Sequence, residues 1–152
     1  KTDPLKYFHD EIGYNYRLVN VLAAIGFAQM ENFSSILKRK KEITRIYKSE
    51  LKNVGDIVFQ ENIDASDPNC WLFTFRTKKM QQLMKYLEKN EIQSRPFWTP
   101  MNKLPMYKNF EYIEKTDLSN KLFKENISIP SSSNLLELDQ EMVIQKIKFF
   151  FK

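Results

Sequence analysis

A long helical segment fills much of the first third of the chain. Residues 20 to about 53 contain no proline, and apolar side chains recur at three- and four-residue spacings between Ile36 and Leu51. Basic side chains lie largely around the opposite side of the same helix: Lys38, Arg39, Lys41, Arg45 and Lys48. Asn32, with two serines close behind it, is expected to kink or recap the helix. The pattern predicts a long, broken amphipathic helix with a solvated basic face.

The formal net charge of +5 raises the question of nucleic-acid binding. Glu42 and Glu50 interrupt the basic run, and the sequence carries neither a zinc-finger spacing nor a recognisable nucleic-acid-reading motif. The sequence therefore argues against a nucleic-acid partner. A basic surface can instead steer an anionic ligand, such as a nucleotide-sugar diphosphate, toward a site.

The remaining residues alternate between short strands and helices. Strands are expected at 57–60, 70–76, 92–98 and 127–129. Helices are expected at 80–89, at 117–124 and at the C-terminal end, where Val143 and Ile147 begin an apolar stripe. The nearly all-apolar strand at 70–76 is expected to be buried on both faces, with Cys70 as a core thiol. The order predicts an α+β fold: residues 1–53 form a loop and long helical segment, and residues 54–152 form a small, mainly antiparallel sheet covered by helices.

Length and composition fit a folded protein without a membrane segment. The 152 residues, of which 42% are hydrophobic, suffice for one core. The longest apolar run, at 21–28, is far shorter than the roughly 20 residues that a membrane helix needs, and no signal-peptide pattern opens the chain. We expect a cytoplasmic protein. The single cysteine excludes an internal disulfide, and no metal-binding motif is recognised.

Two loops carry the candidate site residues. In the first, Gly13 permits a sharp bend, after which Asn15 and Arg17 could hold an anionic ligand at a helix start; a helix cap and a solvated arginine are the plainer alternatives. In the second, prolines at 96, 100 and 105 exclude a helix between them and stiffen a loop that carries Phe97 and Trp98. This loop suits the wall of a binding site, or simply a cover for the sheet.

The motifs together resemble a known enzyme family. The segment GYNYRLVNVLAAIGFAQ (13–29), the Arg39 and Tyr47 pair in the long helix, Trp71 in CWLFTF, and SRPFWTPMNKLPMY (94–107) occur in the order seen in DegT/StrS-type sugar-nucleotide aminotransferases, which depend on pyridoxal 5'-phosphate. The last segment is most similar to the branch that aminates 4-keto sugar nucleotides for bacillosamine- or legionaminate-type sugars. Family members are much longer, so the resemblance implies the C-terminal portion of such an enzyme.

The resemblance also implies roles for individual residues. Asn15 would reach the cofactor phosphate of the other subunit of a homodimer, with Arg17 on the same rim. Arg95, Trp98 and Asn102 would lie near the sugar nucleotide. Asn102 stands where the family commonly has histidine, and asparagine cannot titrate near neutral pH, so an acid role is lost at this position.

The resemblance assigns most of the chemistry to residues outside this sequence. The lysine that forms the Schiff base with the cofactor is not recognisable here, no catalytic residue is assigned, and the chain alone is expected to be inactive. As part of a longer protein it would transfer an amino group from an amino acid, glutamate being the expected donor, to a keto sugar nucleotide. The alternative is a noncatalytic remnant that serves as a dimerisation or nucleotide-sugar-binding module.

Overall fold

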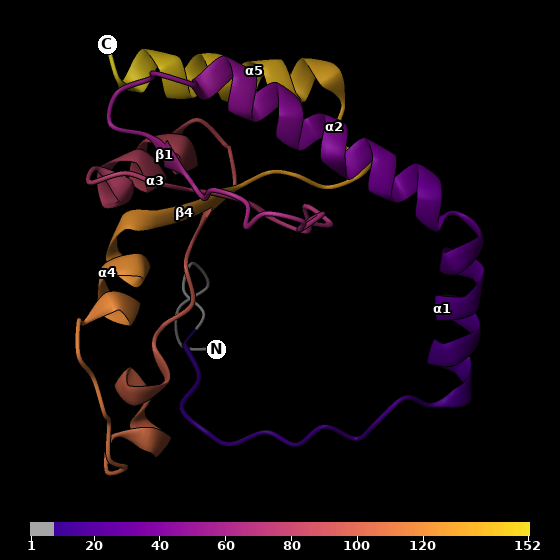
Figure 1. Ribbon diagram of the computed structural model, residues 1–152, viewed down its shortest axis with the longest axis vertical. Helices are drawn as coiled ribbons and strands as arrows, with labels where there is room; N and C mark the ends of the chain where they lie inside the picture. The colour runs from indigo at the N-terminus through magenta and orange to yellow at the C-terminus, as the bar shows by residue number, and fades with distance from the viewer. Residues whose placement is uncertain (1–7) are drawn as a thin grey trace.

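The computed structural model describes residues 8–152 and confirms the expected α+β class (Figure 1). Five α-helices and two 3-10 turns surround a sheet of four strands. In chain order the elements are α1 (Asn20–Glu31), α2 (Phe33–Leu51), β1 (Val58–Phe59), β2 (Phe73–Arg76), α3 (Met80–Lys89), β3 (Arg95–Pro96), η1 (Met101–Lys103), η2 (Pro105–Tyr107), α4 (Leu118–Glu125), β4 (Asn126–Ile129) and α5 (Glu137–Phe150).

The sheet is antiparallel throughout, with strand order β1-β2-β4-β3. The last strand in the sequence, β4, lies between β2 and β3, so that Ile127 pairs with Phe75 on one side and with Pro96 on the other. Because neighbouring residues of a strand point to opposite faces, this register gathers apolar side chains on one face and polar ones on the other. The cross-strand pair Thr74 and Ser128, whose hydroxyls are 2.7 Å apart, marks the polar face.

The core lies between the apolar face of the sheet and helices α2, α3 and α5. Phe73 and Phe75 of β2 are 3% and 1% exposed, and the Tyr47 ring of α2 stacks on Phe73 with ring centroids 4.8 Å apart. The Gln140 side chain of α5 joins the helices, since its Nε2 donates to the Ile43 carbonyl of α2 at 2.9 Å. The other buried core residues are Leu51, Met80, Leu83, Leu87, Ile92, Ile127, Ile129, Val143, Ile144 and Ile147.

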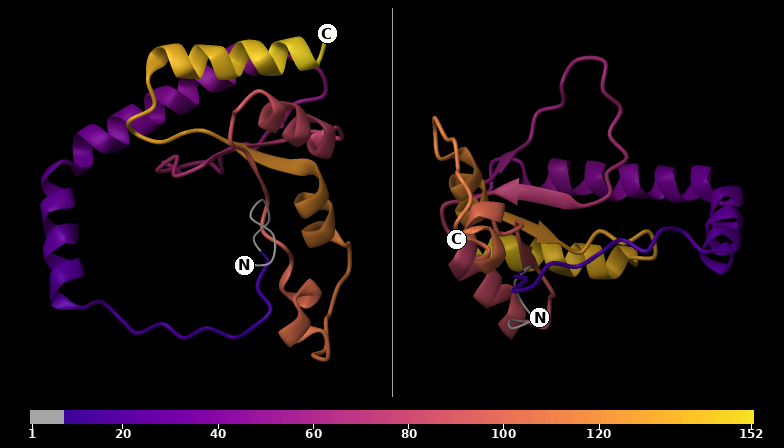
Figure 2. Two further views of the ribbon diagram at one scale, coloured as in Figure 1. Left: turned by 180° about the vertical axis from the view of Figure 1, so that it is seen from behind. Right: turned by 90° about the horizontal axis from the view of Figure 1, so that it is seen from below.

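The long helix breaks where the sequence predicts. Asn32 separates α1 from α2, and α1 turns away from the sheet, so that Figures 1 and 2 show it as an isolated arm at one side of the molecule. None of the α1 residues is buried, although the helix carries large apolar side chains such as Val21 and Phe27, which are 70% and 73% exposed. No helix within residues 8–152 combines the length and apolar character needed to cross a membrane.

The expected strand at 70–76 is wrong in two respects. Strand β2 begins only at Phe73, because Cys70 has a left-handed backbone with φ of 53° that turns the chain before the strand. The strand is buried on one face only, and Trp71 before it is 64% exposed. Cys70 is half-buried outside the core, with its thiol 3.5 Å from the Pro68 carbonyl oxygen. The stretch between the prolines at 96 and 105 is likewise not free of helix, since it includes the 3-10 turn η1.

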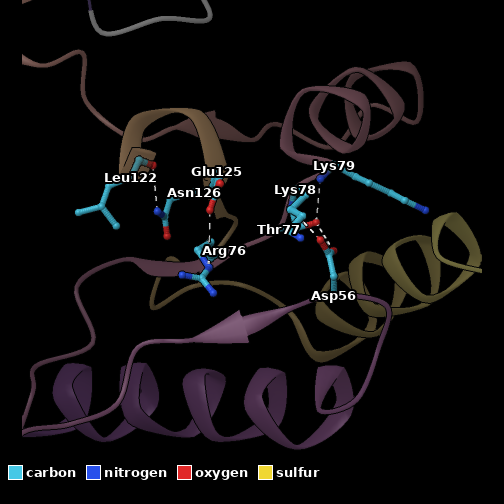
Figure 3. Close-up of polar contacts among 8 residues, drawn as sticks. All are labelled: Asp56, Arg76, Thr77, Lys78, Lys79, Leu122, Glu125 and Asn126. Carbon is cyan, nitrogen blue, oxygen red and sulfur yellow. Dashed lines mark hydrogen bonds and ion pairs between the residues drawn. The ribbon is translucent and has the colours of Figure 1, made fainter. Parts of the chain in front are cut away.

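Asp56 organises the start of α3 (Figure 3). Its carboxylate accepts hydrogen bonds from the Thr77 hydroxyl at 2.5 Å and from the Lys78 N–H at 2.8 Å, and the Thr77 hydroxyl oxygen accepts from the Lys79 N–H at 3.1 Å. Partial burial alone would raise the pKa of Asp56, but the hydrogen bonds from Thr77 and Lys78 outweigh it and hold the pKa below its usual value. The ionised carboxylate therefore stabilises the folded state at neutral pH.

Replacing Asp56 with asparagine is expected to lower the free energy of unfolding at pH 7 by about 0.5–1.5 kcal/mol, because the amide keeps only one of the two acceptor oxygens that Thr77 and Lys78 use. Because the folded-state pKa is depressed, this stabilisation is complete above the unfolded pKa of about 3.9 and disappears as the pH falls through the folded-state value. Urea unfolding followed by circular dichroism at pH 7 and pH 3 measures both effects. The exposed Asp64→Asn is the matched control; equal losses in the two variants at pH 7 would contradict a special role for Asp56.

Candidate ligand-binding site

A hollow of about 550 Å³ lies between the first half of α2, strand β3 and the ends of β2 and β4. Its wall is mostly apolar and carries a few polar groups, which is typical of small-molecule sites. Lys40 comes from α2, Arg95 from β3, and a run of serines from the segment after β4. The lining residues are Phe33, Ile36, Leu37, Lys40, Asn69, Trp71, Leu72, Gln93, Arg95, Pro96, Trp98, Ser128, Ile129, Pro130, Ser131, Ser132 and Ser133.

Side chains of α2 hold the segment after β4 by its carbonyl oxygens. The Arg39 guanidinium donates to the Leu135 carbonyl at 2.7 Å, the Lys40 ammonium to the Ser131 carbonyl at 2.5 Å, and the Tyr47 hydroxyl to the Pro130 carbonyl at 2.8 Å. Burial raises the pKa of Tyr47 above its usual value. Arg39 and Tyr47, which the sequence marks as a family pattern, thus fix one wall of the hollow.

Lys40 ties two walls together. Besides the Ser131 carbonyl, its ammonium donates to the Trp71 carbonyl at 2.6 Å. Burial lowers the pKa of Lys40, and Cys70 partly opposes this effect. The sequence analysis did not single out this lysine, but a signal was present. Lys40 follows Ile36 by four residues and precedes Ile43 by three, so it lies on the apolar stripe of α2.

Two stacked indole rings form the most prominent feature of the hollow. The Trp71 and Trp98 ring centroids are 6.2 Å apart with an angle of 26° between the ring planes, and the Phe97 ring packs edge-on against Trp98 at 5.2 Å. The side chains remain open to solvent, Trp71 being 64% and Trp98 41% exposed. A second hollow of about 720 Å³, which also includes Val58, uses the same two tryptophans, so the pair stands between two depressions.

The structure brings only some of the predicted site residues together. Arg95 and Trp98 line the first hollow. Asn102 belongs to η1 and lines none of the described hollows; its Oδ1 is buried and has no hydrogen-bond partner within residues 8–152. Asn15 and Arg17 lie in the extended segment before α1, at the end of the molecule opposite α2 and α5 (Figures 1 and 2). Residues 1–7, the start of the predicted segment 1–53, lie outside the described residues.

Comparison with known proteins identifies the family to which the chain belongs. The family model described as "DegT/DnrJ/EryC1/StrS aminotransferase family" matches residues 2–148. The chain belongs to this aminotransferase family. It is 35% identical, over 96% of its length, to the GDP-perosamine synthase of Vibrio cholerae, of which it covers 41%. It is 31% identical, over 95% of its length, to a putative pyridoxal phosphate-dependent aminotransferase, EpsN, of Bacillus subtilis, of which it covers 39%.

Solved structures of aminotransferases share the fold of this aminotransferase-family chain. DesV of S. venezuelae matches 99% of the chain with a TM-score of 0.84 and 22% identity, and the chain covers 41% of DesV. A family member from Brucella abortus gives a TM-score of 0.80 over 99% of the chain. The chain thus spans about two fifths of the length of its relatives. The family model and the curated relatives confirm the family resemblance, and the solved structures confirm the fold.

The residues at 15–17 of the aminotransferase-family chain suit the phosphate of pyridoxal phosphate, the cofactor on which the family depends. Arg17 has a left-handed backbone with φ of 70°, and its N–H donates to Asn15 Oδ1 at 2.8 Å. The bond uses the Oδ1 acceptor of the Asn15 amide and leaves the Nδ2 group as a donor, in addition to the Arg17 guanidinium. Both residues line one shallow, exposed hollow with Leu18. An amide donor and a guanidinium that line the same hollow are a fitting donor set for a phosphate.

Proposed function

We propose that this chain is the C-terminal part of a pyridoxal-phosphate-dependent aminotransferase that transfers an amino group from glutamate to a keto sugar nucleotide. The family match across residues 2–148 carries the proposal. The bound cofactor supplies the chemistry that carries the amino group from donor to acceptor. In this proposal an N-terminal part of the protein holds most of that cofactor and contains the lysine that forms the Schiff base. Residues 1–53 join this N-terminal part to the small domain of residues 54–152.

In this proposal Asn15 and Arg17 bind the cofactor phosphate of a second subunit. Their segment is exposed and extends away from the sheet (Figure 1). Residues in such a segment are accessible to a second subunit. The large apolar side chains on α1 provide further surface for such contacts, since monomeric proteins seldom leave so many exposed together. The active protein is then a homodimer.

The sugar nucleotide binds at the hollow that Arg95 and Trp98 line. The Arg95 guanidinium suits the negative charge of a diphosphate, and Trp98 offers an apolar surface. Asn102 replaces the histidine common in the family. It lines none of the described hollows, and we propose that it lies near the sugar nucleotide as a hydrogen-bonding group without a proton to transfer. We place the acceptor among 4-keto sugar nucleotides, in the biosynthesis of surface polysaccharide or glycan sugars of the bacillosamine or legionaminate type, and the enzyme in the cytoplasm.

The experiment pairs the chain with an N-terminal part that carries the lysine. The complex is expected to show cofactor absorbance and to aminate a keto sugar nucleotide at the expense of glutamate. In Asn15→Ala the loss of a hydrogen bond to a charged group is expected to weaken cofactor binding roughly 10- to 150-fold. Titration of the apo complex with pyridoxal phosphate, followed by absorbance, measures the change.

The exposed Asn62→Ala serves as the matched control and should bind the cofactor like the unaltered complex. An unchanged affinity in Asn15→Ala would remove Asn15 from the cofactor site. A well-folded complex that binds no cofactor at all would instead support the second candidate, a noncatalytic dimerisation or nucleotide-sugar-binding module. That candidate is favoured by one observation: the large apolar side chains of α1 are exposed, for example Val21 and Phe27 at 70% and 73%.

A further inference from the structure

We infer that Trp71 and Trp98 form a stacking platform for the base of a nucleotide, and that Lys40 is a positioning residue for this platform. The inference rests on the proposed function, because it assigns one part of the sugar nucleotide to one part of the site. It adds Trp71 and Lys40 to the residues that shape ligand binding.

The geometry of the two rings favours a flat, aromatic ligand group. The indole planes are within 26° of parallel, and both side chains are substantially exposed beside hollows large enough for a nucleotide base. A large exposed aromatic surface is unfavourable in water unless a ligand or a partner covers it. Bases stack on such rings irrespective of their hydrogen-bonding edges, because every base has a π face.

The charges around the first hollow indicate where the base and the phosphates of a nucleotide would each bind. The Lys40 ammonium already uses two of its three N–H donors on the carbonyl oxygens of Trp71 and Ser131, so most of its hydrogen-bonding capacity serves the protein. Arg95 lies in the same hollow, on β3, and provides the positive charge that a diphosphate requires. A nucleotide in this hollow thus has its base on the indole pair and its phosphates toward Arg95.

Lys40 fixes the platform through the backbone of Trp71. The tryptophan precedes β2 and lies in a stretch where Cys70 has a left-handed backbone, so the ladder of the sheet does not hold it. The 2.6 Å hydrogen bond from Lys40 instead connects the Trp71 carbonyl to α2, a helix whose Ile43 and Tyr47 are fully buried in the core. A rigid platform loses less conformational entropy on binding than a mobile one.

The chain offers a direct test, because Trp71 and Trp98 are its only two tryptophans. Tryptophan fluorescence of the complete chain therefore reports on the platform alone. GDP and guanosine are expected to quench it saturably after correction with free tryptophan amide, whereas inorganic pyrophosphate is expected to leave it unchanged. The titration needs no cofactor, so failure here is distinct from failure of the proposed transamination.

Variants assign the effect to residues. Trp71→Leu, observed through Trp98, is expected to weaken GDP binding roughly 5- to 150-fold, the range for losing one base-stacking ring. Lys40→Met is expected to weaken the binding of GDP and of guanosine by the same factor, because Lys40 acts through Trp71. Its circular dichroism spectrum is expected to stay unchanged. Phe110→Leu, at another exposed aromatic residue, is the control and should bind GDP normally.

Two outcomes would overturn the inference. One is a saturable response to pyrophosphate equal to that of GDP, which would identify a phosphate site. The other is an unchanged GDP affinity in Trp71→Leu, checked by calorimetry. A large side chain placed in each hollow in turn shows which one holds the base. Ser132→Phe fills the first hollow and is expected to weaken GDP binding, whereas Val58→Phe fills the second and is expected to leave GDP binding unchanged. The reverse result would overturn the assignment to the first hollow.

Discussion

Phe75→Ala is expected to lower the free energy of unfolding by about 3–5 kcal/mol, the cost typical of removing a buried aromatic side chain. Phe75 is 1% exposed in the central strand β2, pairs with Ile127 of β4 and contacts the Phe73 ring at a centroid distance of 6.4 Å. Its removal leaves a cavity among helices and strands that are already closely packed. Urea unfolding followed by far-ultraviolet circular dichroism measures the loss.

The matched control is Phe110→Ala, because Phe110 is 70% exposed and lies in a loop. Its effect on the free energy of unfolding should stay within about 0.5 kcal/mol. If Phe75→Ala cost no more than this control, the core would not lie between β2 and the helices as described.

Gly55→Ala is expected to cost about 2–5 kcal/mol of unfolding free energy, the sum of two effects. Gly55 has φ of 54°, a left-handed conformation that costs a residue with a Cβ about 1–2 kcal/mol. In addition, a Cβ at this position would lie 2.0 Å from Cδ1 of Phe151, and overpacking of this kind costs about 1–3 kcal/mol. Thermal and urea unfolding of the variant measure the total.

A second glycine provides a control of opposite sign. Gly26 lies within α1, and a Cβ added to it would meet no atom of the described residues within 4 Å, so Gly26→Ala is expected to stabilise that helix by up to about 1 kcal/mol. The double variant Gly55→Ala with Phe151→Ala separates the two effects, since only the backbone cost of alanine at 55 survives in it. Equal costs of Gly55→Ala in both backgrounds would show that contact with Phe151 plays no part.

Much of the architecture is predictable because strong local signals agree with the tertiary structure. The apolar spacing through Met80 and Leu87 predicts α3 at its observed bounds, and the polar residues around Asn32 predict the break between α1 and α2. The residues before β2 show where this fails. An apolar run such as Cys70 to Leu72 has the composition of a buried strand, and only the left-handed backbone at Cys70 takes it out of the sheet.

The candidate site was predictable only in part, because it is assembled from distant segments. Motif similarity led to Arg95 and Trp98, which do line one hollow. The contributions of Lys40 and Trp71 depend on a lysine reaching two carbonyl oxygens 31 and 91 residues further along the chain. Backbone acceptors leave no trace in residue type, so contacts of this kind remain hidden in a sequence.

The same use of backbone acceptors bears on how binding preference can change in this family. Arg39, Lys40 and Tyr47 grip the segment after β4 through carbonyl oxygens, which every amino acid possesses. The side chains of Ser132 and Ser133, which line the hollow, can therefore be exchanged while the backbone that carries them stays in place. Helix α2 thus fixes the backbone of this wall independently of the side chains that the wall presents. Substitution of the serines can therefore change the ligand preference while the fold stays the same.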